Sequence, residues 1–188
     1  SDVYKRQIYV YAASFHGKKL LALGGNSGNP IFDWFIGREL NPRIGEFDIK
    51  TFNELRPGLI LWALLDISCV CHQYTKFGWV SDSIVLVTLF HVWYIVDSLI
   101  NESTILTQMD ITTDGFGFML SVGDLAWLPF TYCLQARFLA FHPIHLGWLG
   151  VLAILAVQFT GYYIFRVANL EKNEFRHGRN PKGTYAMR

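Results

Sequence analysis

The chain has 188 residues, of which 52% are apolar, 16% aromatic and 16% charged, and its mean hydropathy is +0.26. Because a typical soluble protein carries roughly 25% charged residues, this composition argues against an ordinary soluble domain and for a membrane protein. The formal net charge of +1 argues against a polyanionic partner for the whole chain, so no nucleic-acid binding is expected.

The first seven residues, SDVYKRQ, are predicted to be foreign to the protein. They can be encoded by a nucleotide run that resembles the transposon-end adaptor of sequencing libraries, so residues 1–7 are expected to be a sequencing artefact and are left out of the fold prediction. A genuine polar segment is the alternative. Residues 8–188 are expected to be part of a longer membrane domain, because position 1 is not Met.

Four apolar segments approach the roughly 20 residues that a membrane helix needs. They cover Gly58–Tyr74, Ser83–Ile100, Phe116–Phe141 and Leu146–Phe165. Pro129 is predicted to break the third segment, and a fifth, partial helix is expected in residues 8–23. These segments predict an all-α fold, a polytopic membrane helix bundle.

Ionisable residues interrupt the first three segments: Asp66, His91, Asp97, Asp124 and Arg137. Charged groups are costly in hydrocarbon and usually face a bundle interior or a wet cavity, so the helices should surround a polar cavity. The alternative for Asp97 and Arg137 is a position near the membrane interface.

Basic residues in the loops predict the orientation of the chain. Residues 37–57 and the tail from 166 onward are rich in Lys and Arg, whereas 101–115 and 138–145 contain neither. The basic segments should face the cytosol. Because four spans separate them, residues 37–57, 101–115 and the tail are expected at one end of the bundle.

Residues 25–58 are punctuated by Gly and Pro, and charged residues alternate with aromatic ones. The pattern predicts an ordered functional loop that is neither a helix nor a clean strand; a solvated connector is the alternative. Its run GNPIFDWFIGRELNPR resembles the signature of the sterol reductases, and FDIKTFNELRPG continues it. The runs MDITTDGFGFMLSVGDLAWLPFTY and GYYIFRVANLEKNEFR extend the resemblance to residues 20–178. The pattern is most similar to the sterol C14 reductases, which include the reductase domain of the lamin B receptor.

This resemblance implies an endoplasmic-reticulum membrane enzyme of about ten helices, of which the chain holds four to five. The family uses NADPH to saturate the C14–C15 double bond of sterol intermediates. The alternatives are another sterol reductase, of the 7-dehydrocholesterol or C24(28) type, or a nuclear-envelope scaffold like the lamin B receptor. The family's later motifs for NADPH do not occur in this sequence, so the fragment alone is expected to be inactive.

The tail after the fourth segment predicts a cofactor contact. If that helix continues, a period of 3.6 residues places Arg166, Asn169, Lys172, Asn173 and Arg176 on one stripe. Segregated cations suit the phosphates of NADPH, whereas a plain membrane anchor, the alternative, needs no segregation. The resemblance aligns Lys172 and Arg176 with the family's first cofactor contacts, and Arg166 and Asn169 complete the predicted binding set.

Reduction of an unactivated alkene also needs an acid. Tyr94 and Asp97 lie three residues apart and share a helix face, so the carboxylate could orient the hydroxyl or tune its acidity. By resemblance Tyr94 is the candidate proton donor, and Asp110 and Asp114 come next. The alternative is an interfacial Tyr and Asp.

No metal site is predicted. The run CVCH, residues 69–72, holds two of the three cysteines, but two residues two apart do not share a helix face. The odd number of cysteines and their apolar surroundings also argue against a secreted disulfide framework. The run HPIH, residues 142–145, is expected to form a luminal turn, and GRNPKG lacks the spacing of a phosphate-binding loop.

Overall fold

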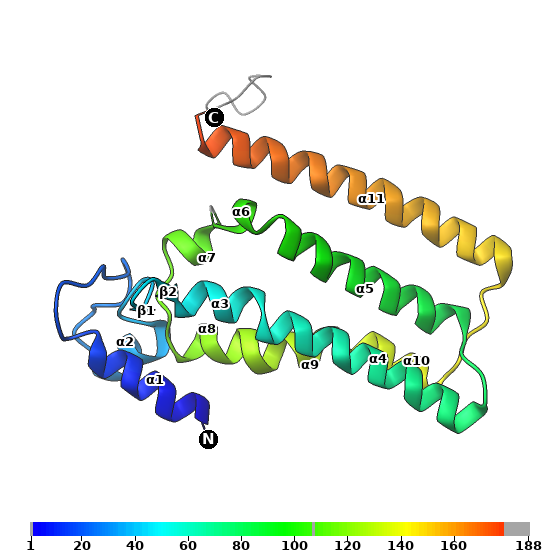
Figure 1. The fold of residues 1–188 in the computed structure, drawn as a ribbon, viewed down its shortest axis with the longest axis horizontal. Helices are drawn as coiled ribbons and strands as arrows, with labels where there is room; N and C mark the ends of the chain where they lie inside the picture. The colour runs from blue at the N-terminus through cyan, green and yellow to red at the C-terminus, as the bar shows by residue number, and fades with distance from the viewer. Residues whose placement is uncertain (1, 107, 179–188) are drawn as a thin grey trace.

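The computed structural model describes residues 2–106 and 108–178, and these residues are mostly helical (Figure 1). In chain order the elements are α1 (Asp2–Ala13), α2 (Pro30–Ile36), β1 (Arg43–Ile44), β2 (Phe47–Asp48), α3 (Ile49–Leu55), α4 (Pro57–Phe77), α5 (Asp82–Ile100), α6 (Glu102–Ile105), α7 (Met109–Thr112), α8 (Phe118–Val122), the π-helical segment η1 (Gly123–Trp127), α9 (Leu128–Tyr132), α10 (Leu134–Phe141) and α11 (Gly147–Arg176). In the described part of the chain, one antiparallel hairpin, β1–β2, is the whole sheet content. The predicted all-α membrane bundle is confirmed.

Three helical stretches within the described residues are long and apolar enough to cross a membrane. They are Ile49–Phe77, Asp82–Ile100 and Gly147–Arg176. The first predicted span begins earlier than expected because α3 leads into α4 with one residue between them. Pro57 occupies the first turn of α4 and Gly78, with φ 77°, ends it, which are the positions that each residue favours.

The third predicted span consists of α8, η1, α9 and α10 in succession. The predicted break at Pro129 was wrong, because the helix passes through this proline and is interrupted at Cys133 instead. Pro129 lies in the first turn of α9, directly after the π-helical turn of η1. Since proline lacks the N–H that would bond back along the helix, a local change in the hydrogen-bond pattern accommodates it.

The order predicted for residues 25–58 is confirmed, but the expected lack of helix was wrong for α2 and α3. Asn29 caps α2 by accepting hydrogen bonds from two backbone N–H groups, and Pro30 occupies the first helical position. The carboxylate of Asp48 caps α3 by accepting the backbone N–H of Thr51 at 3.0 Å. Short capping motifs therefore make helices in a segment whose composition reads as a loop.

The segment α1 ends at Ala13, so the fifth, partial helix predicted in residues 8–23 forms only in its first half. Residues 2–7 form the start of α1, and their predicted foreign origin stays a prediction. Within them the guanidinium of Arg6 donates to Asn53 Oδ1 at 3.0 Å and to Ser121. Helix α1 thus lies against α3 and α8.

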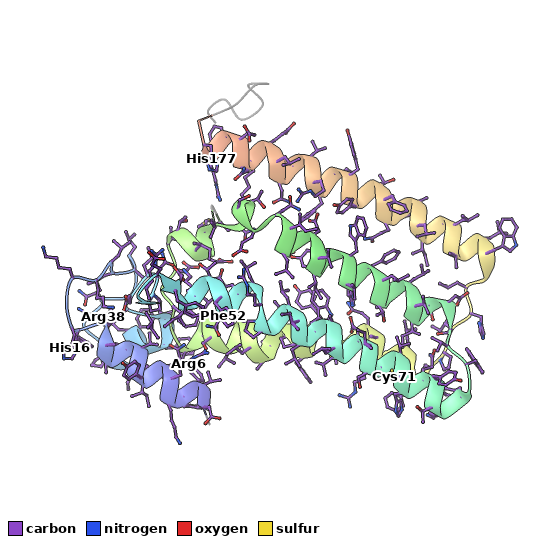
Figure 2. All side chains as sticks on the ribbon, in the orientation of Figure 1. Arg6, His16, Arg38, Phe52, Cys71 and His177 are labelled. Carbon is purple, nitrogen blue, oxygen red and sulfur yellow. The ribbon has the colours of Figure 1, made fainter. Side chains whose placement is uncertain are left out.

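The long helices run alongside one another, and α5 lies between α4 and α11 (Figure 1). The β-hairpin, α6, α7 and the end of α11 lie together at one end, which confirms that residues 37–57, 101–115 and the start of the tail share that end. Figure 2 shows His177 and Arg38 at this same end of the molecule. That this end faces the cytosol stays a prediction. Three of the basic residues on which it rests, Arg179, Lys182 and Arg188, lie outside the described residues.

Helix α11 buries none of its residues within this chain, which suits a helix in contact with lipid. The carboxylate of Asp82, at the start of α5, fixes its beginning by accepting the backbone N–H groups of Leu146 and Gly147 at 3.0–3.1 Å. Polar contacts with α5 therefore help to hold the start of α11 beside the bundle.

Candidate active site

Two segments that carry the sterol reductase signature meet in direct backbone contact. Gly37 ends α2 with φ 105°, and a Cβ there would lie 2.3 Å from the backbone nitrogen of Gly117 and 2.4 Å from the carbonyl carbon of Gly115. Beside this contact, the N–H of Phe116 donates to the carbonyl of Glu39 at 3.0 Å. Only glycine fits at Gly37, and its packing fixes the start of α8 against the end of α2.

Asp33 holds the turn ahead of α2. Its Oδ1 accepts the hydroxyl and the backbone N–H of Ser27 at 2.7 and 2.8 Å, and its Oδ2 accepts the N–H of Gly28 at 3.3 Å. The hydroxyl of Ser27 is the largest cause that holds the pKa of the Asp33 carboxyl below its ordinary value. The aspartate of the signature is thus a structural anion that orders residues 27–33.

Lys50 is fully buried in α3 and fixes the loop ahead of α8. Its ammonium donates to the carbonyls of Ile111 at 3.2 Å and Asp114 at 2.5 Å. The side chains of Asp110 and Asp114, the second-choice acids, are exposed beside this anchor. The sequence identified Lys50 only as a loop charge, since spacing along the chain gives no sign of these contacts.

Tyr94 lines a cavity of about 230 Å³ between α3–α4, α5, α7 and α8–α9. Its polar lining includes Glu54, Ser98, Asp110 and Asp124, while leucines form its apolar part. The phenol and the carboxylates therefore share one chamber at the end of the bundle that holds the hairpin and α7. This mixed lining is typical of a site that handles protons.

Tyr94 also lines a second cavity, of about 190 Å³, between α5 and α11. A neighbouring apolar cavity of about 260 Å³ shares Trp93 and Tyr162 with it and continues along the two helices. The ring of Tyr94 lies 5.9 Å from that of Trp62 and 6.3 Å from that of Phe165. Tyr94 thus stands where a chamber lined by carboxylates meets an apolar groove.

Asp97 connects α5 to α11. Its Oδ1 accepts the hydroxyl of Tyr162 at 2.9 Å and the amide of Asn101 at 3.1 Å, and its Oδ2 accepts Arg166 Nη1 at 3.3 Å. Among the described residues no hydrogen bond joins Asp97 to Tyr94. The two share one helix face as predicted, but the catalytic role of each stays a prediction.

The predicted cofactor stripe lies on one continuous helix, because α11 extends to Arg176. Its 30 residues span about 45 Å at 1.5 Å per residue, which exceeds the roughly 30 Å of hydrocarbon in a bilayer. Lys172 and Arg176 are exposed near its end. Arg166 is paired with Asp97 instead, and Asn169 donates to the carbonyl of Phe165 at 2.9 Å. The exposed pair, one helical turn apart, has the charge and spacing to hold a phosphate.

The other intramembrane charges differ in their surroundings. Asp66 is fully buried, and its Oδ2 lies 2.6 Å from His91 Nδ1. The ring of His91 lies 4.6 Å from that of Trp62. Asp124 is also buried, so these side chains face the bundle interior as expected. Arg137 is exposed on the surface of this chain.

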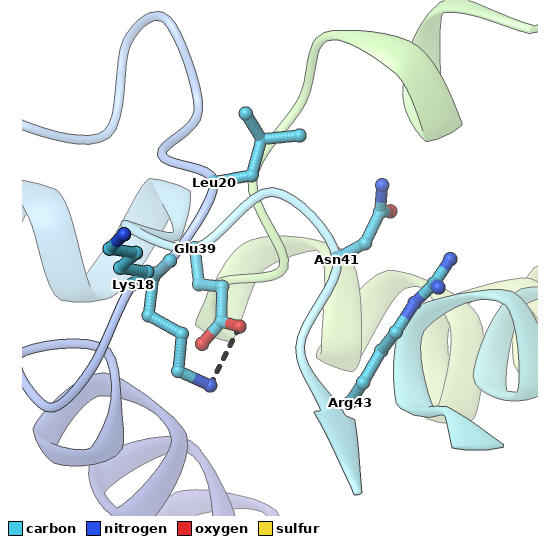
Figure 3. A pocket seen from close by; sticks show the side chains of 6 residues that line it. Lys18, Leu20, Glu39, Asn41 and Arg43 are labelled. Atoms are coloured by element: carbon cyan, nitrogen blue, oxygen red, sulfur yellow. Dashed lines mark hydrogen bonds and ion pairs between the residues drawn. The ribbon is translucent and has the colours of Figure 1, made fainter. Parts of the chain in front are cut away.

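A larger cavity, of about 390 Å³, lies apart from Tyr94 near the hairpin (Figure 3). Its lining includes Lys18, Leu20 and Asn41. The ammonium of Lys19 forms an ion pair with Glu39 at 3.0 Å. The acid of the cavity, Glu39, is held in this ion pair, and Tyr94 does not line the cavity. The chemistry therefore points to the Tyr94 chamber.

Residues 3–187 match the model of the Ergosterol biosynthesis ERG4/ERG24 family. The chain belongs to this family. It is 65% identical to the Delta(14)-sterol reductase erg24 of Schizosaccharomyces pombe, over 92% of this chain and 41% of the relative. It is 56% identical to the Delta(14)-sterol reductase ERG24 of Saccharomyces cerevisiae, over 91% of this chain and 42% of the relative. The chain spans about two fifths of the length of these relatives, and the resemblance to sterol C14 reductases is confirmed.

Sequence reasoning missed Glu54 as a residue of the Tyr94 cavity in this ERG4/ERG24 family member, and it identified Asp124 only as an intramembrane charge. They lie 70 residues apart in the chain yet line the same cavity as Tyr94. The available signal was an acid inside each signature run, NELRPG and SVGDLAW. No spacing rule joins two such runs, because their contact depends on how η1 crosses α4.

Proposed function

We propose that the protein containing this chain reduces the C14–C15 double bond of sterol intermediates with NADPH in the endoplasmic-reticulum membrane. The position of Tyr94, between a chamber with carboxylates and an apolar groove, is the observation that carries the proposal. The two relatives reported above are both named Delta(14)-sterol reductase, and these names support this bond over the other double bonds that sterol reductases saturate.

Tyr94 acts as the general acid in this proposal. The apolar groove between α5 and α11 accepts the sterol rings from the lipid bilayer, and the Tyr94 hydroxyl donates its proton to C15 of the alkene. A tertiary cation then forms at C14, near the aromatic ring of Phe165, which lines the same groove and stabilises positive charge. A positioned acid of this kind contributes about 10²- to 10⁴-fold in rate.

When bound, NADPH supplies the hydride that completes the reduction at C14. Lys172 and Arg176 would hold one of its phosphates, since both are exposed at the end of α11. Asn169 and Arg166 continue the stripe toward Tyr94. Asp97 acts by fixing Arg166, which sets the position of the cofactor-binding stripe relative to the acid.

The site is proposed to need residues beyond this chain. The curated relatives are more than twice as long, and the phosphates of NADPH need more partners than two exposed cations. We therefore expect the 188 residues alone to be inactive and the full-length protein to be active.

A sterol profile tests the proposed function. Membranes from a yeast strain that lacks C14 reductase activity, expressing the full-length protein, should convert a C8, C14-diene to its C8-monoene when NADPH is added. No conversion would contradict the proposal, and saturation of the C7 or C24(28) double bond instead would favour the alternative sterol reductases. Turnover by the 188-residue chain alone would contradict its predicted incompleteness.

A further inference from the structure

We infer that Glu54 and Asp124 return a proton to Tyr94 after each turnover, a role that rests on the proposed function. The three side chains line one cavity of about 230 Å³. Glu54 comes from α3, Asp124 from η1 and Tyr94 from α5, so three separate elements converge on this space. The carboxyl pair lies on the polar side of Tyr94, opposite the apolar groove between α5 and α11.

A close helix crossing positions Asp124. A Cβ at Gly58 would lie 1.9 Å from the carbonyl oxygen of Asp124, so α4 and η1 approach as closely as their backbones allow. The π-helical turn that carries Asp124 alters the direction of side chains relative to an α-helix, and such turns frequently occur at functional sites. Asp124 is only 9% exposed as a result.

Each acid has a buried oxygen without a hydrogen-bond partner among the described residues. These atoms are Glu54 Oε1 and Asp124 Oδ2. A buried polar atom left unpaired is costly, so native structures retain one where water or chemistry uses it. Because one water occupies roughly 30 Å³, the chamber has room for a short water chain between the carboxyls and the phenol.

Charged groups lie near both acids. The buried ammonium of Lys50 and the carboxylates of Asp48 and Asp110 face Glu54, while Asp110, Lys50 and Arg6 face Asp124. Lys50 is itself held by two backbone carbonyls, so the positive charge beside the pair is fixed. The chamber is thus built around these two acids.

The proton balance is complete. Tyr94 gives its hydroxyl proton to C15 and becomes a phenolate, while the dihydronicotinamide of the proposed reaction supplies the hydride. A protonated carboxyl of the pair then passes its proton through water to the phenolate oxygen and becomes a carboxylate. Bulk water at the hairpin end of the bundle reprotonates that carboxylate. Each reduced double bond therefore consumes one proton from solvent.

Rapid-mixing kinetics on the full-length protein test this role. Glu54→Gln and Asp124→Asn should leave the first turnover at the wild-type rate, because Tyr94 begins protonated. Later turnovers should slow by about 10- to 100-fold, with a larger solvent deuterium isotope effect and unchanged KM for sterol and NADPH. Glu46→Gln is the matched control, since Glu46 is an exposed acid of the hairpin outside the chamber.

Three outcomes would overturn the inference. Wild-type steady-state rates in both variants would show that neither acid supplies the proton. Equal slowing of the first and later turnovers would show a structural effect. In that case Glu54→Asp and Asp124→Glu, which keep an acid, should fail to restore the rate of the later turnovers. Absence of C14 reduction by the wild-type protein would instead contradict the proposed function, and the relay would fall with it.

Discussion

The contact between Asp97 and Arg166 should contribute measurably to the stability of the bundle. The two side chains are only 12% and 19% exposed, so solvent screens their 3.3 Å ion pair less than it would a surface pair. Exposed pairs contribute about 0.2–1 kcal/mol, whereas hydrogen bonds to charged groups contribute about 1.5–3 kcal/mol. We expect a coupling free energy of about 1.5–2 kcal/mol, near the lower end of the second range because the geometry is long.

A double-mutant cycle measures this coupling. The free energy of unfolding would be compared for wild type, Asp97→Ala, Arg166→Ala and the double variant, in detergent micelles. Asp97→Ala should cost the most, because it also removes the bonds to Tyr162 and Asn101. By the scaling of 150–250-residue domains, a loss of 2 kcal/mol lowers the melting temperature by about 4–8 °C.

Tyr162→Phe is the control, since it removes one neutral donor to Asp97 and leaves the ion pair intact. Its cost should be about 1.5–3 kcal/mol, because the lost hydrogen bond ends on a charged carboxylate. A coupling below about 0.3 kcal/mol, within ordinary additivity, would refute the reasoning. Asp82 should keep the other end of α11 attached in every variant.

Three further predictions concern the cofactor stripe, the glycine contact and the response to acid. Lys172→Ala and Arg176→Ala in the full-length protein should raise the KM for NADPH about 10-fold more than that for NADH, which lacks the 2′-phosphate; equal increases would indicate a plain membrane anchor. Gly37→Ala should lower the free energy of unfolding by about 2 kcal/mol or more in thermal melts, because the new methyl group meets backbone atoms; a wild-type melting temperature would contradict that contact. The pKa of Asp33 is lowered in the folded state, chiefly by the Ser27 hydroxyl. The ionised carboxylate therefore adds to the free energy of unfolding above its ordinary pKa of 3.8, and this stabilisation is lost as pH falls through the lower folded value. Asp33→Asn should therefore reduce the loss of stability in this acid range, and an unchanged pH dependence of the melting temperature would count against it.

Hydropathy and resemblance predicted the helices well, because a membrane span must be long, apolar and internally hydrogen-bonded. The predicted start of the last span at Leu146 lies one residue from the observed start of α11. The start of α2 could also have been predicted, because Asn29 followed by Pro30 is a typical helix start. Composition alone indicated a loop there. The π-helical turn at Gly123–Trp127 could not be predicted, because it depends on the packing of α4 against this segment.

Helical spacing predicted how candidate residues are arranged along a single helix. The period of 3.6 residues placed Tyr94 and Asp97 on one face of α5. The grouping of Arg166 with Lys172 stays a prediction, because Arg166 pairs with Asp97 whereas Lys172 is exposed. Spacing could not show which neighbour each side chain contacts, and Asp97 bonds across to α11. Glu54 and Asp124 come together only through the crossing at Gly58, which no pattern along the chain encodes.

The position of deuterium in the sterol product tests the proposed chemistry most directly. Full-length protein given a C8, C14-diene and NADPH in D₂O should place deuterium at C15, and NADPH deuterated at the nicotinamide C4 should place it at C14. Tyr94→Phe should lower both rates by about 100-fold or more while NADPH binding persists. An unreduced C14–C15 bond with the wild-type protein, or a wild-type rate for Tyr94→Phe, would contradict the account.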